Sequence, residues 1–162
     1  MAGRVLSDAS PLIGLARVGG LPWLQPLFGT VWVPQEVQRE VLPGRNLPDE
    51  RALLASFERG DLCVCPTTPL APLLPELDEG ETACIRLALA DAAPALLLMD
   101  ERAGRAIAAE HGLRMAGTAA IIGMAQARGL IPSARAVFTR LHATDFRISA
   151  QVIATILRRV GE

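Results

Sequence analysis

Short apolar runs alternate along the chain with longer stretches whose apolar side chains recur at helical spacing. The runs end abruptly at polar or proline residues, which is typical of strands in a parallel sheet covered on both faces. Strands are predicted at 4–7, 31–33, 62–65, 95–99 and 113–116. Helices are predicted at 11–18, 21–28, 34–42, 49–59, 80–91, 101–111, 118–129, 133–141 and 149–160. Because strands and helices alternate, we expect an α/β fold with three layers, α/β/α, around a central parallel sheet of four or five strands.

The length of the chain suits one domain. With 162 residues, 51% of them hydrophobic, the chain can bury one sizeable core and is too short for two ordinary ones. We therefore expect residues 1–162 to form a single domain. Neither a G-x-G-x-x-G motif after the first strand nor a G-x-x-x-x-G-K-[ST] motif occurs, so dinucleotide and P-loop chemistry are not expected.

Two aspartates stand directly after predicted strands. The apolar run ending at Met99 stops at Asp100, and the first run is followed by Asp8. In open α/β sheets the chemistry collects beyond the carboxyl ends of the strands, so both are candidate catalytic acids. The competing interpretation of Asp8 is a helix cap, although Ser10 with Pro11 after it is the expected cap of that helix.

Three glutamates are further candidates. Glu40 lies on the predicted helix after the second strand and Glu81 at the start of a later helix, where the helix dipole favours any acid. Glu101 follows Asp100 directly and can pair with Arg105 one turn on. For Glu40 a solvated surface position is an equally good explanation.

Carboxylates that converge from separate strand ends suit a hard cation, Mg²⁺ or Mn²⁺, and the phosphoryl chemistry that such ions support. The distribution of charge along the chain also suits a cation and a phosphate. Acids outnumber arginines two to one in residues 1–101, and arginines outnumber acids three to one in residues 102–162. Arg102 and Arg105 fall in the first half of a helix, where the dipole disfavours cations, which suggests an anion such as a phosphate nearby.

The remaining reactive residue types point to no other chemistry. The three cysteines form no C-x-x-C motif and leave an odd thiol, which suits a reducing compartment. No signal-peptide core and no apolar run of about 20 residues are present, so we expect a soluble, cytoplasmic protein without a membrane segment. His111 and His142 lie beside helix ends and are interpreted as structural or solvated.

Five segments together resemble the PIN domain, an RNase H-like nuclease fold, in the prokaryotic PIN-like group related to VapC-type toxins. They are DASPLIGLARVG, VPQEVQREVL, LDEGETACIRLA, LLLMDERAGR and AGTAAII, and they span nearly the whole chain in this order. The resemblance implies a metal-dependent ribonuclease. It places the metal-binding and catalytic acids at Asp8, Glu40, Glu81 and Asp100.

Supporting residues are expected as well, of which the resemblance implies Ser10 and Glu101, and it also implies partners. The residues expected to steady the acids or contact the substrate are Ser10, Glu101, Arg102, Arg105 and Thr118, of which Thr118 is also the predicted cap of its helix. Toxins of this group are held by a small antitoxin protein and commonly dimerise, so the expected partners are RNA, a cognate antitoxin and a second copy of the chain. The apolar helix from Thr118 to Gln126 is a candidate for such contacts.

Two other functions remain open from the sequence. The first is a PIN-like RNA- or protein-binding module with negligible hydrolysis. The second is a small phosphatase-like α/β enzyme with Asp8 as the nucleophile.

Overall fold

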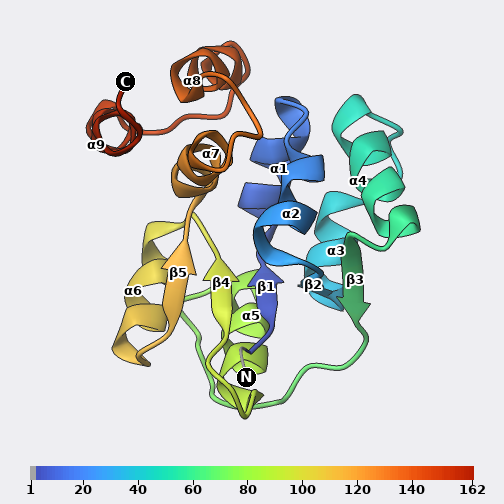
Figure 1. Ribbon diagram of the computed structural model, residues 1–162. Coiled ribbons are helices and arrows are strands. Elements are labelled where there is room, and N and C mark those ends of the chain that lie inside the picture. The colour runs from blue at the N-terminus through green and yellow to red at the C-terminus, as the bar shows by residue number, and fades with distance from the viewer. Residues whose placement is uncertain (1–2) are drawn as a thin grey trace.

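The computed structural model describes residues 3–162. Five strands form one parallel sheet in the order β3-β2-β1-β4-β5, as Figure 1 shows. The strands are β1 (Val5–Ser7), β2 (Val31–Pro34), β3 (Leu62–Cys65), β4 (Leu96–Leu98) and β5 (Arg114–Ala116). All five apolar runs of the sequence are therefore strands, and the predicted parallel sheet is confirmed.

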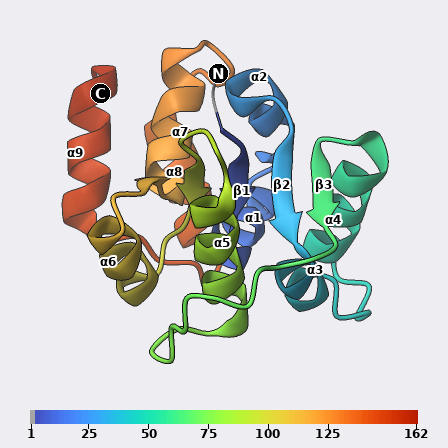
Figure 2. The same cartoon turned by 90° about the horizontal axis from the view of Figure 1, so that it is seen from below.

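Helices flank the sheet on both faces and complete a three-layer α/β/α arrangement. In Figure 2, α2 and α7 lie on one side of the strands, and α3, α5 and α6 on the other. The helical elements are α1 (Ala9–Arg17), η1 (Leu21–Trp23), α2 (Leu24–Phe28), α3 (Gln35–Val41), α4 (Pro48–Arg59), α5 (Glu79–Ala90), α6 (Arg102–Glu110), α7 (Thr118–Ala127), α8 (Ala134–His142) and α9 (Ala150–Val160). Each predicted helix is present within a few residues of its expected bounds.

The core explains why the strands are so uniformly apolar. Leu6 of β1 and both Leu97 and Leu98 of β4 have no solvent-exposed surface. Helix α5 contacts β1, β2 and β4 on one face, while α2 and α7 lie on the other face and contact β2 and β5, so side chains that point to either face of the central strands are covered. Such strands need hydrophobic residues at every position and show no alternation.

The strand order places a topological switch beside β1. The chain runs from β1 outward through β2 to β3, and then returns to the other side of β1 with β4 and β5. Ser7 at the end of β1 is in register with Leu98 at the end of β4. Ligand sites in open α/β sheets form where the strand order reverses in this way, outside the carboxyl ends of the strands.

Three local predictions were wrong. Ser10 is not the cap of α1, because the helix begins at Ala9 and Asp8 occupies the N-cap position, without a side-chain cap bond. Thr118 is the first residue of α7 rather than its cap, which is Gly117. Helix α7 is also not an exposed contact helix: most of its residues are buried, and it packs against α1, α8 and α9.

Other local features of the described residues concern the cysteines, one histidine and the hydropathy of the helices. Cys63, Cys65 and Cys84 are free thiols. His142 has a structural role, since its Nε2 accepts a hydrogen bond of 3.2 Å from the backbone N–H of Ile148. Over residues 3–162, no helix has the length and hydropathy needed to cross a bilayer.

Candidate active site

Two aspartates follow the two strands that meet at the switch. Asp8 comes directly after β1, and Asp100 lies two residues beyond the last residue of β4. The backbone N–H of Asp8 donates to the carbonyl of Leu98 at 2.9 Å, which continues the pairing of β1 with β4 past the end of β1. Both aspartates therefore lie at the same edge of the sheet, as their positions after apolar runs predicted.

The carboxylate of Asp8 is buried among other acids. Its residue is 3% exposed. The pKa of Asp8 is raised to about 7, mainly by burial and in addition by the nearby charges of Asp78, Glu81 and Glu40, while the backbone N–H of Ala9 acts in the opposite direction. A buried carboxylate in this setting is stable only when a proton or a cation neutralises it.

The carboxyl groups of Glu40 and Glu81 are also partly buried and close to other acids. Glu40 lies in the last turn of α3 and Glu81 in the first turn of α5, where it is 5% exposed. Desolvation raises the pKa of both carboxyls above the ordinary value, and the charge of Asp78 adds to the effect at each. The charge of Glu81 also raises the pKa of Glu40. The acids from three separate elements thus interact.

Glu81 is held by a capping box at the start of α5. Its backbone N–H donates to Asp78 Oδ1 at 2.8 Å, and the backbone N–H of Asp78 donates to Glu81 Oε2 at 3.1 Å. This reciprocal arrangement satisfies two amide groups at the helix start and fixes the direction of the Glu81 side chain. The conformation of Glu81 is therefore set by local sequence.

Two glycines make room for the acids. A Cβ atom on Gly80 would lie 3.0 Å from Asp8 Oδ1 and 3.4 Å from Glu40 Oε2, so these two carboxylates converge on one glycine of α5. A Cβ atom on Gly104 of α6 would lie 3.2 Å from Glu81 Oε1. A side chain at either position would occupy space that the carboxylates use.

Asp100 is fixed to the start of α7. Its Oδ1 accepts a hydrogen bond of 2.7 Å from the backbone N–H of Thr118, and its Oδ2 accepts one of 2.7 Å from the Thr118 hydroxyl. On the other side, Arg105 Nη1 donates to the carbonyl of Met99 at 2.8 Å. Asp100 and Arg105 both lie against Gly117, where a Cβ atom would be 2.8 Å from Asp100 Oδ1 and 3.6 Å from Arg105 Nη1. A carboxylate and a guanidinium group therefore stand side by side.

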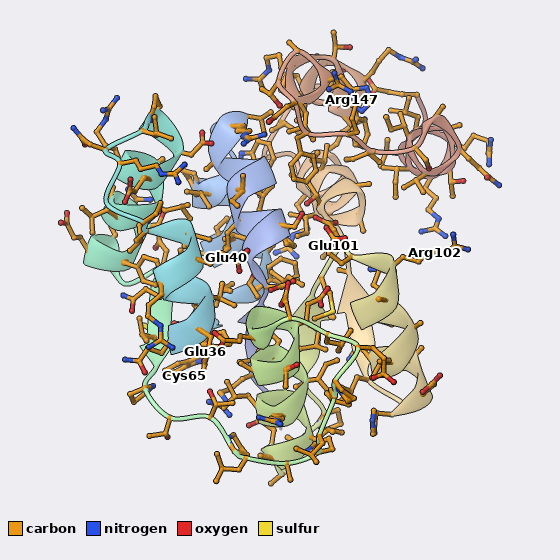
Figure 3. The ribbon with its side chains drawn as sticks, turned by 180° about the vertical axis from the view of Figure 1, so that it is seen from behind. Glu36, Glu40, Cys65, Glu101, Arg102 and Arg147 are labelled. Atoms are coloured by element: carbon orange, nitrogen blue, oxygen red, sulfur yellow. The ribbon has the colours of Figure 1, made fainter. Side chains whose placement is uncertain are left out.

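A cavity of about 950 Å³ opens beside these residues. The predicted site residues that line it are Ser10, Glu40, Asp100, Glu101 and Arg105. Asp8, Glu81 and Thr118 are buried behind its surface. Arg102 is exposed and is not among the cavity-lining residues; Figure 3 shows it at the outer side of α6. The surface pair expected between Glu101 and Arg105 is not formed among the described residues, since Arg105 bonds to Met99 instead.

The donor chemistry at this edge fits a hard divalent cation, because the acids that interact there offer only carboxylate oxygens. Nevertheless, among residues 3–162 no three His, Cys, Asp or Glu side chains are grouped so that they could hold one ion. Glu81 and Asp100 direct oxygens at backbone amides instead. The side chains thus provide the charge that attracts a cation without forming a complete coordination sphere.

Asp78 is the residue that the sequence interpretation missed. It is exposed, yet its charge acts on Asp8, Glu40 and Glu81 together, and its backbone orients Glu81. The signal was readable, since an acid followed three positions later by a glutamate before an apolar helix is a capping-box pattern.

Comparison with known protein families gives a match over nearly the whole chain. A family model described as a PIN domain matches residues 4–162. No curated protein shows significant similarity to the chain. The match includes every strand, every helix and all the acids described above, and PIN domains have a nuclease-type fold. The parallel five-stranded sheet, its acidic edge at the β1–β4 switch and this match together show that the chain belongs to the PIN-domain family.

Proposed function

We propose that this PIN domain is a divalent-metal-dependent endoribonuclease that hydrolyses RNA phosphodiesters in the cytoplasm. In this proposal the catalytic acids are Asp8, Glu40, Glu81 and Asp100, and they hold Mg²⁺ or Mn²⁺. When bound, such an ion polarises the scissile phosphate and lowers the pKa of a water molecule that attacks it.

The observation that carries the proposal is the state of Asp8. A carboxylate that is 3% exposed, with its pKa raised to about 7 by burial and by the charges of three other acids, is strained when ionised at neutral pH. A structural acid in the same place would be expected to have a cationic partner such as arginine. The arrangement therefore favours an external cation.

Several residues of the chain have roles in this proposal that need no ion. The Thr118 hydroxyl and amide keep Asp100 in one orientation at the cavity wall. Arg105, beside Asp100, presents a guanidinium group to the cavity, where it can bind a phosphate oxygen and offset the charge that develops during hydrolysis. Ser10 adds a hydroxyl at the rim.

The decisive test is cleavage of a fluorescently labelled single-stranded RNA by the full chain with Mg²⁺ or Mn²⁺. We expect cleavage that EDTA abolishes and that Asp8→Asn and Asp100→Asn each reduce at least 100-fold, a loss typical for groups of an active site. Glu58→Gln removes one exposed acid of α4 outside the cavity and serves as the matched control, with unchanged cleavage. Circular dichroism spectra establish that each variant is folded.

The competing function, a binding module, has a specific observation in its favour, namely the incomplete grouping of the acids around any one point. It predicts that the chain retains RNA and does not cleave it with either ion. Cleavage that persists unchanged in Asp8→Asn would contradict both functions, because it would point to a contaminating nuclease or to a different active site.

The biological role that we propose is the toxin of a toxin–antitoxin pair, working as a homodimer with a small cognate antitoxin as partner. Support comes from the PIN fold itself. Induced expression of the chain in bacteria should then arrest growth, Asp8→Asn should relieve the arrest, and a short neighbouring reading frame should do so in trans. Light scattering of the purified protein tests the dimer.

A further inference from the structure

The cavity beside the acids extends to a second surface that the proposed catalysis does not use. Its far wall consists of the connection between α8 and α9 and one side of α9 itself. Figure 3 shows Arg147, on this connection, near the top of the view, above and to the right of Glu40. The cavity therefore joins an acidic edge to a wall contributed by the C-terminal helices.

That wall carries cations without acidic partners. Asp145, an acid of this wall, is paired with Arg17 of α1, which also pairs with Asp49, so these groups contribute little free charge. In contrast, Arg147 donates only to backbone carbonyls, including that of His142 at 3.0 Å. Arg159 makes no hydrogen bond or ion pair within the described part of the chain.

On α9 the cavity-lining polar residues form one stripe. Gln151, Thr155 and Arg159 are spaced four residues apart and all line the cavity, whereas the neighbouring Arg158 does not. Residues four apart lie on one face of a helix. The stripe is about 12 Å long at 1.5 Å per residue. Because nucleotides of a stacked strand repeat about every 3.4 Å, the stripe is long enough to contact more than one nucleotide.

The wall is held firmly in place. Ile156 and Leu157 of α9 are buried against the rest of the molecule, each 7% exposed. Gly123 of α7 allows the two helices to approach closely, because a Cβ atom there would lie 2.7 Å from Ile156 Cγ2. The stripe on α9 therefore keeps a fixed position relative to the acids.

We propose that this wall, with Arg147, Gln151 and Arg159, binds the sugar–phosphate backbone of the RNA strand and guides a phosphodiester to the acids. The inference rests on the proposed function for the identity of the strand as RNA. Phosphates bind arginines in a sequence-independent manner, and amide side chains such as that of Gln151 commonly contact phosphate and sugar oxygens. The arginines of the wall are needed for RNA binding because the carboxylates at the other side of the cavity would by themselves repel a polyanion.

The test is RNA binding without cleavage, measured by fluorescence anisotropy of a labelled single-stranded RNA in EDTA over a range of salt concentrations. Arg159→Gln should weaken binding about fivefold to tenfold and lower the salt slope by about 0.7, the value for one phosphate contact on a single strand. Arg158→Gln, on the same turn but outside the cavity, is the matched control and should stay within about twofold. Arg159→Lys should restore most of the affinity.

The outcomes separate this inference from the proposed function. Equal effects of Arg159→Gln and Arg158→Gln would overturn the binding wall even if the chain cleaves RNA with Mg²⁺. Selective loss in Arg159→Gln, with no cleavage under any metal condition, would sustain the binding wall and refute the nuclease. If polyglutamate binds as tightly as RNA with the same dependence on Arg159, the wall is a site for acidic polypeptides and the assignment to RNA is wrong.

Discussion

Thr118 donates two hydrogen bonds to the carboxylate of Asp100, one from its backbone N–H and one from its hydroxyl, each 2.7 Å long. The pair ties the end of β4 to the start of α7 across the cavity edge. Because Thr118 has no exposed surface, water cannot replace its hydroxyl when the group is removed. Asp100 therefore serves both the fold and the candidate site.

Thr118→Val keeps the shape of the side chain and removes the hydroxyl. We expect the free energy of unfolding to fall by about 1.5–3 kcal/mol, the usual contribution of a hydrogen bond to a charged acceptor. Urea denaturation followed by circular dichroism measures it. Thr139→Val, which removes an exposed hydroxyl bonded within α8, is the control and should change the value by less than about 0.5 kcal/mol. Equal losses in the two variants would contradict a special role of the Asp100 contact.

Gly80→Ala adds a methyl group where two carboxylates converge. The new Cβ atom would lie 3.0 Å from Asp8 Oδ1 and 3.1 Å from Val37 Cγ2, so the acids must move. Alanine favours the helix by about 1 kcal/mol, which offsets part of the crowding. We expect little change in metal-free stability and an affinity for Mn²⁺ that falls about tenfold, comparable to losses on disturbing groups that support metal ligands. Isothermal titration calorimetry measures the affinity.

The control for this substitution is Glu79→Gln, which changes an exposed residue in the same turn of α5. It should leave Mn²⁺ binding within about twofold, since exposed charges act weakly. If Gly80→Ala binds Mn²⁺ as tightly as the unmodified chain, the ion does not lie at Asp8 and Glu40.

The pH dependence of stability should report Asp8. Its pKa is raised from 3.8 in an unfolded chain to about 7 in the fold, so the folded state binds the extra proton between these values. The free energy of unfolding of the metal-free protein should therefore fall as pH rises from about 4 to 7, with each unit of pKa difference worth about 1.4 kcal/mol at most. Asp8→Asn removes this component.

The informative quantity is the difference between the unmodified chain and Asp8→Asn at each pH, because other acids titrate in both. Thermal unfolding in EDTA at pH 5, 6, 7 and 8 provides it. Asp8→Asn should become progressively more stable than the unmodified chain toward pH 8. Parallel curves would mean that Asp8 is ionised without strain.

Divalent ions should stabilise the protein, and more so at high pH. Carboxylates must lose their protons before they bind a metal, and the raised pKa of Asp8 moves that competition into the neutral range. At a concentration of Mn²⁺ 100 times its dissociation constant, the gain is about 2.7 kcal/mol. Differential scanning fluorimetry with Mg²⁺ or Mn²⁺ at pH 6 and pH 8 shows the effect. A shift of the same size in Asp8→Asn would place the ion elsewhere.

Much of the fold was accessible from the sequence because its signals are local. The run ending at Met99 is a strand because it is short, wholly apolar and followed at once by Asp100, and the same logic located β1 before Asp8. Once both strands are parallel and central, their carboxyl ends share one edge. That Asp8 and Asp100 lie at one edge follows from the topology alone, whereas the approach of Glu40 and Glu81 to Asp8 depends on how α3 and α5 pack.

What the sequence did not reveal depends on contacts between distant segments. The side chain of Asp100 accepts hydrogen bonds from Thr118, 18 residues further on, and no local pattern showed that its carboxylate is engaged in this way. The spaces at Gly80 and Gly104 exist only after α5 and α6 pack beside the acids. Likewise, the different roles of the adjacent Arg158 and Arg159 depend on how α9 is rotated against α7.

The position of β1 between β2 and β4 has a consequence for folding. β1 pairs early in the sequence with β2, but its other neighbour comes from much further along the chain, and such long loops close slowly. Asp8 and Glu40 can come together with the first pairing, whereas Asp100 reaches the same edge of the sheet only when β4 docks. The docking of β4 therefore adds one more carboxylate to an edge that already carries Asp8 and Glu40, and a cation bound there would favour this step.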